Sequence, residues 1–250
     1  MKLTILLCDH FPGLLPDYIP SYASMFVRLF STNVAPLTYD VCYVPDGNLP
    51  ALPTTHDDDE PTVHLITGCN LSVYDDVPWI HALLHWIRRA AALGEHIVGI
   101  CFGHQAVAQA LGGHVERAAA GWGIGVRTST LHGDAALKAF PEARMSLHYN
   151  HHDQVTMPPP QATVFAQSAF CPVDGMMVGD NIITFQGHPE YVGEYAVHLI
   201  MNFAESEPLH VRHEALRSIG AIRHDGDRVA AFIAQYFDRK SHTTAPTATQ

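Results

Sequence analysis

Short apolar runs alternate with helical patterns through the first 100 residues, and this alternation constrains the fold more than any other feature. The apolar runs, each of strand length, cover residues 2–8, 38–44, 62–67 and 96–100. Runs of this kind are typical of strands that are buried on both faces. Residues 18–30 and 78–93 carry apolar side chains at helical spacing. The sequence therefore predicts an α/β fold, with an open, mostly parallel sheet flanked by helices on both faces.

The second helical pattern has recognisable ends. It begins at Pro78, a residue that suits the first turn of a helix, and it stops at Gly94. The acidic pair Asp75 and Asp76 stands just before Pro78, and we expect it to cap the helix N-terminus.

The pattern changes after Gly112. Short alternating segments with turn residues between them run from residue 115 to residue 185 and predict a small antiparallel subsheet. Residues 190–205 and 225–240 then return to helical spacing.

Charge and hydropathy exclude several classes of partner. The chain has 25 acidic and 14 basic residues, a formal net charge of −11, which disfavours nucleic acid and anionic membranes. No apolar run approaches the roughly 18 residues that a membrane span needs, and the N-terminus lacks the features of a signal peptide. We expect a cytoplasmic protein. Its five cysteines form no CxxC pair, so neither a disulfide framework nor a zinc site is predicted.

Residues 97–111, IVGICFGHQAVAQAL, contain the strongest chemical pattern. A buried strand runs into Gly99, Cys101 and Gly103, and a helix begins at once. This is the G-x-nucleophile-x-G pattern of a tight strand-to-helix turn. The positive end of the helix dipole favours the thiolate, and the N–H of Phe102 points where an oxyanion would form. Cys101 is therefore the candidate nucleophile.

A candidate base follows another predicted strand, in the segment IITFQGHPE at residues 182–190. Alternation along the chain places His188 and Glu190 on the same side. The carboxylate can then accept a hydrogen bond from one imidazole nitrogen and leave the other facing a thiol.

Together these segments resemble the class I glutamine amidotransferases. Cys101 in GICFGHQ, with His188 and Glu190 in FQGHPEY, is similar to the catalytic triad of that family. The chain looks like a stand-alone protein similar to the glutaminase domain of GMP synthase. Plant γ-glutamyl peptidases are also similar around ICFGHQ and QGHPE. The resemblance implies a flavodoxin-like fold and hydrolysis of the glutamine side-chain amide through a cysteine thioester, with no cofactor.

The resemblance also assigns roles around the triad. It implies the backbone N–H groups of Cys69 and Phe102 as oxyanion donors, and Gly68, Gln105 and His152 as substrate-binding residues. The family's usual glycine-glycine-proline loop reads Gly68-Cys69-Asn70 in this chain, so the loop is expected to differ in shape.

The resemblance covers about residues 1–205, which we expect to form an amidotransferase-like domain. Residues 206–240 are predicted to be a C-terminal helical extension of that domain, and residues 241–250 a disordered tail. No synthetase segment follows the triad, so the ammonia acceptor or partner synthetase would be a separate molecule.

Two alternatives to this function remain open. The same triad would serve a γ-glutamyl peptide hydrolase that acts alone, and a third hypothesis is a catalytically silent binding protein on the same scaffold. The segment LHYNHHD, with His148, His151, His152 and Asp153, could suggest a metal site. Because no cysteine pair or helical H-E-x-x-H supports it, we interpret the segment as a loop that lines the substrate pocket, with no metal.

Overall fold

The computed structural model describes residues 1–11, 13–34, 36–53, 62–205 and 207–241. Of the tail predicted over residues 241–250, Ser241 is described as the last residue of a helix, and residues 242–250 lie outside the described residues. None of the described helices is long and apolar enough to cross a membrane.

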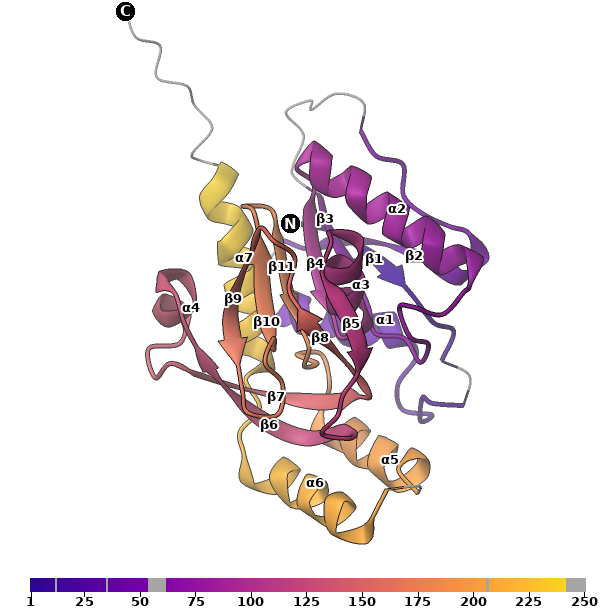
Figure 1. Cartoon of the computed structure of the whole chain (residues 1–250), viewed down its shortest axis with the longest axis vertical. Helices are drawn as coiled ribbons and strands as arrows, with labels where there is room; N and C mark the ends of the chain where they lie inside the picture. Colours follow the sequence, from indigo (N-terminus) through magenta and orange to yellow (C-terminus); the bar gives the residue numbers. More distant parts are fainter. Residues whose placement is uncertain (12, 35, 54–61, 206, 242–250) are drawn as a thin grey trace, which may run out of the picture.

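One large sheet organises the molecule (Figure 1). Its nine strands, in chain order, are β1 (Lys2–Leu7), β2 (Thr38–Tyr43), β3 (Thr62–Ile66), β4 (His96–Ile100), β6 (Gly123–Leu131), β7 (Arg144–His151), β9 (Ala162–Gln167), β10 (Gly175–Val178) and β11 (Ile182–Phe185). Their order across the sheet is β2-β1-β3-β4-β11-β10-β9-β6-β7. The pairs from β2 to β11 are parallel, and those from β11 to β7 are antiparallel.

Strands β5 (His114–Arg117) and β8 (Asp153–Met157) form a separate antiparallel pair. The predicted fold class is therefore confirmed: an open sheet with a parallel half, flanked by helices, and a small antiparallel sheet. The antiparallel strands β6, β7, β9 and β10 continue the large sheet itself, because β11 pairs with β4 on one side and β10 on the other.

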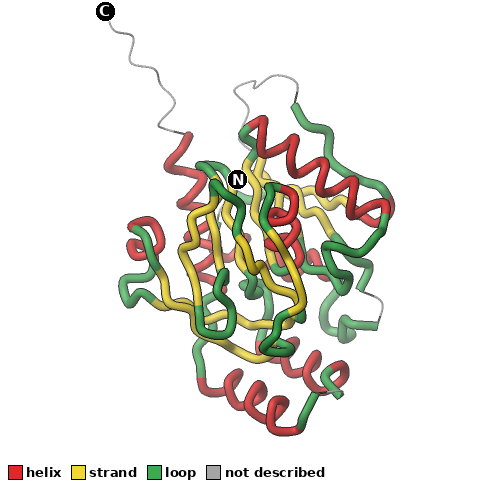
Figure 2. The backbone as a smooth tube through the Cα atoms, in the orientation of Figure 1, coloured by secondary structure: helices red, strands yellow, loops and turns green. Residues whose placement is uncertain are grey.

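Helices cover both faces of the parallel half, as Figures 1 and 2 show. The helices are α1 (Tyr22–Asn33), α2 (Pro78–Leu93), α3 (Phe102–Ala110), α4 (Asp134–Ala139), α5 (Gly193–Phe203), α6 (Leu209–Ala221) and α7 (Gly226–Ser241), with a 3-10 turn η1 at Val44–Asp46. Alternate residues of β1 belong to different cores: Leu3 and Ile5 pack with α1 and α7, and Leu6 packs with α2 and α3.

The N-terminal ends of α1 and α2 depart from the sequence prediction. Helix α1 begins after Ser21, because Ser21 and Ser24 form a capping box. Helix α2 has the predicted bounds, but its N-cap is Val77 without a side-chain hydrogen bond. The expected cap by Asp75 and Asp76 is wrong, because Asp75 accepts from the N–H of Ser72 and Asp76 bonds His81.

The two C-terminal patterns also begin later than predicted. The helix expected over residues 190–205 is α5, which begins at Gly193, so Glu190 lies in the turn before it. Helices α4 and α6 were not predicted individually. Helix α6 has a single buried residue, Ala215, and therefore little apolar periodicity to detect.

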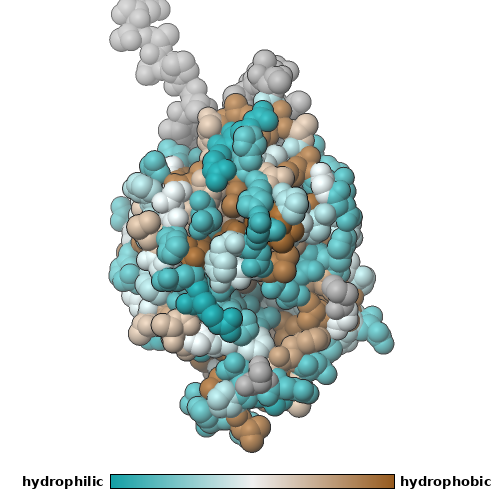
Figure 3. Space-filling view, turned by 45° about the vertical axis from the view of Figure 1, so that its right-hand side comes forward, coloured by the Kyte–Doolittle hydropathy of each residue, from teal (hydrophilic) through white to brown (hydrophobic). Residues whose placement is uncertain are grey.

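Helices α5 and α6 form a pair at the lower end of the molecule (Figure 1). Figure 3 shows hydrophobic residues at this end, among hydrophilic ones. Exposed apolar side chains of the pair include Met201, Phe203 and Leu209.

Candidate active site

Cys101 lies at a strained turn between β4 and α3. Its φ of 53° and ψ of −103° are unusual for a residue other than glycine. A Cβ atom on Gly103 would lie 2.2 Å from the carbonyl oxygen of Ile66, and one on Gly99 would lie 2.6 Å from that of Gly103. The glycines on both sides of Cys101 are thus required by close backbone packing, as the G-x-C-x-G pattern suggested.

His188 and Glu190 form a buried pair in the turn after β11. His188 Nδ1 and Glu190 Oε1 are 2.7 Å apart, and the two residues are 2% and 1% exposed. Burial alone would lower the pKa of His188, but Coulombic interactions and hydrogen bonds with Glu190 and Cys101 outweigh it and raise the pKa to about 10. The imidazole is therefore protonated at neutral pH.

The strand order brings this pair to the candidate nucleophile. Because β11 pairs directly with β4, His188 and Cys101 follow neighbouring parallel strands at the same edge of the sheet. Gly68, which follows β3, lies against both. A Cβ on Gly68 would be 3.2 Å from His188 Cε1 and 3.8 Å from Cys101 Cβ.

Aromatic and backbone groups, most of them far away in sequence, hold the base. The Tyr22 hydroxyl, on α1, donates to Glu190 Oε1 at 2.8 Å. The Tyr191 ring stacks on the His188 ring, with centroids 4.0 Å apart and planes 13° from parallel. The His188 N–H donates to the carbonyl oxygen of His148 on β7 at 2.8 Å. Tyr22 was not predicted to belong to the site, because its helical spacing marks it only as a core residue.

Cys69 and Phe102, the two residues expected to supply oxyanion N–H groups, lie close to a backbone hydrogen bond that joins their two segments. The Gly103 N–H donates to the carbonyl oxygen of Thr67 at 3.2 Å and so joins the start of α3 to the end of β3. Phe102 is the first residue of α3, where an N–H has no partner within the helix. Burial raises the pKa of the Cys69 thiol to about 12, so this second thiol stays protonated at neutral pH.

The structure places Gln105 away from open solvent. Gln105 is 3% exposed, and its Nε2 donates to the Asp153 carbonyl oxygen at 2.8 Å and to Gln186 Oε1 at 3.1 Å. Both donors of this amide are therefore used inside the protein, where they join α3 to β8 and β11. A contact between this amide nitrogen and substrate would require one of these bonds to open.

The end of β7 and His152, which follows it, lie next to the candidate nucleophile. Cys101 Sγ lies 3.9 Å from the carbonyl oxygen of Asn150. The indole N–H of Trp122 donates to Asn150 Oδ1 at 3.1 Å, and the same indole stacks on the His152 ring at 4.5 Å. His152, the third expected substrate-binding residue, therefore lies on the Trp122 side of this segment.

Asp153, the first residue of β8, links the loop after β3 to the end of β7. Its carboxylate accepts from the Ser72 hydroxyl at 2.5 Å and from the Tyr74 hydroxyl at 3.0 Å. Ser72 and Tyr74 belong to the loop after β3 that contains Gly68. Asp153 therefore fixes that loop relative to the end of β7, where Asn150 lies.

The histidines near this segment are buried and neutral. Burial, with smaller contributions from nearby groups, lowers the pKa of His148 and of His151 to about 3. Among the described residues, no group of three or more His, Cys, Asp or Glu side chains could hold a metal ion. His151 Nδ1 instead bonds the Asp153 carbonyl oxygen at 2.9 Å.

A thiol beside an imidazole, which is in turn bonded to a buried carboxylate, is suited to acyl transfer through a covalent thioester. The nearby backbone turn offers N–H groups for an oxyanion. This constellation requires no bound cofactor.

Comparison with known proteins agrees with this description. The family described as Glutamine amidotransferase class-I matches residues 33–206. Gamma-glutamyl peptidase 3 of Arabidopsis thaliana is 29% identical over 185 residues, which cover 72% of each chain. A glutamine-hydrolysing GMP synthase of Aeropyrum pernix is 34% identical over 98 residues, which cover 39% of this chain and 19% of that one.

The fold has close structural counterparts. A glutamine amidotransferase from Thermotoga maritima superposes with a TM-score of 0.70 over 97% of this chain and 98% of its own, at 18% sequence identity. At that identity the similarity establishes the fold alone. It extends beyond residue 206 and therefore includes the C-terminal helices.

Proposed function

Because the chain belongs to the class I glutamine amidotransferase family, we propose that it is a cysteine hydrolase that cleaves γ-glutamyl amide bonds. The observation that carries the proposal is the buried His188–Glu190 pair, 2.7 Å apart, beside Cys101 at a strained turn. A buried imidazolium that is paired with a carboxylate can stabilise a thiolate and then supply a proton to a leaving group.

The reaction follows from these roles. The Cys101 thiolate attacks the δ-carbonyl carbon of the γ-glutamyl group, and the N–H groups of Cys69 and Phe102 stabilise the oxyanion. His188 gives its proton to the departing amine as the C–N bond breaks, which leaves a glutamyl thioester. Neutral His188 then takes a proton from water, the hydroxyl attacks the thioester, and glutamate leaves as the thiolate and the protonated His188 are restored. Glu190 keeps the imidazole in the required tautomer throughout.

The leaving group is the finer part of the proposal. We favour an amino acid or peptide amine over ammonia, because similarity to a γ-glutamyl peptidase extends over 72% of both chains. The similarity to GMP synthase covers only 39% of this chain. This preference reverses the order of the two substrates expected from the sequence, which was glutamine first and γ-glutamyl peptides as the alternative. Glutamine, with ammonia passed to a partner synthetase, is the second candidate.

Glutamate release by the purified protein tests the proposal, with glutamine and γ-glutamyl dipeptides supplied side by side. We expect faster release from the peptides and a loss of about 10⁴-fold or more in Cys101→Ala. Cys42→Ala is the matched control, because Cys42 is a free thiol on the edge strand β2. Preference for glutamine would support the second candidate. No thioester and no glutamate from either substrate class would refute the hydrolase.

A further inference from the structure

The segment between α6 and α7, residues 222–225, lies against the turn that carries the candidate base. His224 Nε2 is 3.0 Å from the carbonyl oxygen of His188. Immediately after the segment, Gly226 packs closely on the neighbouring residue: a Cβ there would lie 2.2 Å from the Pro189 carbonyl oxygen. Both contacts come from a part of the chain beyond residue 206, where the family match ends.

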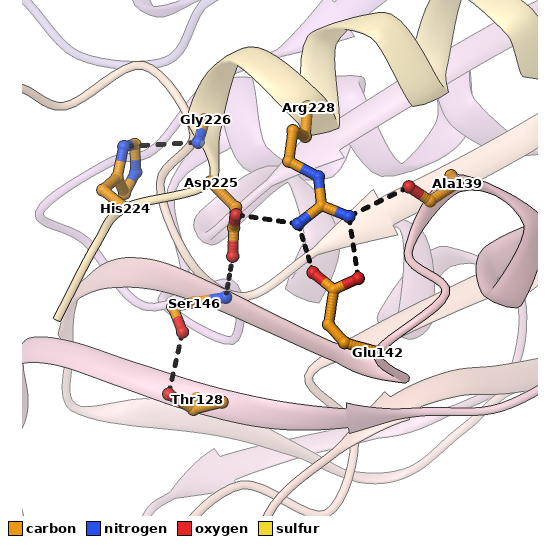
Figure 4. A network of polar contacts seen from close by, with 8 residues as sticks. All are labelled: Thr128, Ala139, Glu142, Ser146, His224, Asp225, Gly226 and Arg228. Atoms are coloured by element: carbon orange, nitrogen blue, oxygen red, sulfur yellow. Dashed lines mark hydrogen bonds and ion pairs between the residues drawn. The ribbon is translucent and has the colours of Figure 1, made fainter.

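Hydrogen bonding fixes the tautomer of His224. The N–H of Gly226 donates to His224 Nδ1 at 3.3 Å, a contact drawn in Figure 4. A ring nitrogen that accepts cannot also carry the proton in a neutral imidazole. Burial lowers the pKa of His224, which keeps the ring neutral. The proton is therefore on Nε2, and Nε2–H donates to the His188 carbonyl oxygen.

The segment is itself anchored to the sheet and to α4, as Figure 4 shows. The Asp225 carboxylate accepts from the Ser146 N–H at 2.8 Å, and the Asp225 N–H donates to the Ser146 carbonyl oxygen at 2.8 Å. Arg228 bonds Asp225, Glu142 and the Ala139 carbonyl oxygen. His224 is consequently presented from a rigid support.

With this bond, both backbone polar groups and one ring nitrogen of His188 are occupied. The His188 N–H donates to His148, its carbonyl oxygen accepts from His224, and its Nδ1 bonds Glu190. Nε2 remains for Cys101. The peptide planes on both sides of His188 are thus fixed, and they set the direction of the imidazole.

We propose that His224 is a positioning residue for the hydrolysis: its Nε2–H fixes the His188 carbonyl and so aims the His188 imidazole at Cys101. This inference rests on the proposed function, because it assigns His188 as the base. The C-terminal helical part of the chain would then contribute to the reaction without contacting the substrate.

Two substitutions of His224 separate the effect of its hydrogen bond from the effect of its ring volume. His224→Phe keeps the ring and removes the donor, whereas His224→Gln places an amide N–H near the position of Nε2. For the faster substrate we expect His224→Phe to lower kcat about 10- to 100-fold and to change KM less than about threefold, since small misplacements of catalytic groups have effects of this size. His224→Gln should recover most of the lost kcat.

A second readout does not depend on substrate. Alkylation of Cys101 by iodoacetamide, followed by mass spectrometry of its peptide across pH, reports the thiolate stabilised by His188. We expect His224→Phe to shift the midpoint of this profile upward and His224→Gln to restore it. If the wild-type protein cleaves no γ-glutamyl amide, the proposed function fails, and the alkylation profiles still test His224.

His213→Phe is the matched control, because it replaces an exposed histidine of α6 by the same ring. It should leave kcat and the alkylation profile near wild type. Equal losses in His224→Phe and His224→Gln, or no loss in either, would overturn the inference.

If His224→Phe does not fold, His224→Asn replaces it, because the Asn side chain is one methylene shorter than that of Gln. Equal kcat and alkylation profiles for the Asn and Gln variants would then overturn it.

Discussion

The two halves of the candidate site are held in different ways. On the nucleophile side, Cys101 takes its position from its immediate neighbours: a strand, two glycines and a helix within residues 96–110. On the base side, His188 and Glu190 lie in a turn without regular structure, held by Tyr22, His148 and His224. These three residues come from α1, β7 and the segment before α7.

Local interactions therefore position the nucleophile, whereas long-range interactions position the base. A strained backbone at Cys101 persists because tight packing on both sides leaves no alternative. A hydrogen-bonded pair such as His188–Glu190 can rotate unless other groups fix it. We therefore expect substitutions of the glycines beside Cys101 to damage the fold, and substitutions around His188 to damage the reaction first.

Gly103→Ala should have the largest effect, on stability. The added Cβ would meet the Ile66 backbone at 2.2 Å, and backbone on both sides leaves little room for relief. We expect a loss of about 3 kcal/mol in the free energy of unfolding, at the upper end of overpacking costs. Urea denaturation measures it.

Gly220→Ala is the control for that prediction. Gly220 lies in α6 with no atom within 4 Å of an added Cβ, and the substitution should stabilise the protein by about 0.5–1 kcal/mol. Similar stabilities for the two variants would show that the contact between Gly103 and β3 can relax, and the contrast between the two halves would disappear.

Glu190→Gln should have the next largest effect, on activity. The amide can donate to His188 Nδ1 and so favour the tautomer whose Nε2 already carries the proton, which cannot accept one from Cys101. We expect kcat/KM for glutamate release to fall by about 100-fold or more. Glu194→Gln, an exposed change in the first turn of α5, should leave it unchanged.

The same variant predicts a change in how stability depends on pH. The pKa of His188, raised to about 10, lies above its unfolded value of about 6.5. The stabilisation from its protonation is therefore complete below about pH 6.5 and is lost as pH rises through 10. Denaturation midpoints between pH 7 and pH 10 should fall less steeply in Glu190→Gln than in the wild type. Parallel curves would show that Glu190 does not raise this pKa.

Tyr22→Phe should have the smallest effect. It removes the hydroxyl that donates to Glu190 Oε1 at 2.8 Å and keeps the ring, which stacks on Phe11 at 3.9 Å. Loss of one hydrogen bond to a buried carboxylate corresponds to about 1.5 kcal/mol, or a fall of roughly tenfold in kcat/KM. Tyr18→Phe, on an exposed ring, is the control. Equal activity of the two variants would mean that the Glu190 carboxylate is fixed without α1.

Some parts of the structure could be predicted from sequence and others could not. The bounds of α2 and β4 agree with the sequence pattern, because their apolar periodicity and the glycine after α2 are local features. Helix α6, with one buried residue, offered no such periodicity. The cap expected from Asp75 and Asp76 failed because both side chains find other partners, Ser72 and His81, in the folded chain.

The sequence by itself determined the turn at Cys101, because glycines at positions 99 and 103 and a strand followed at once by a helix restrict the backbone locally. It also determined that His188 and Glu190 are two residues apart and so able to pair. The tertiary structure alone decided that β11 pairs with β4, which brings His188 to Cys101, and that Tyr22 and His224 reach the base. Such contacts join residues far apart in the chain, and their geometry depends on how the helices and the sheet pack, which no local pattern specifies.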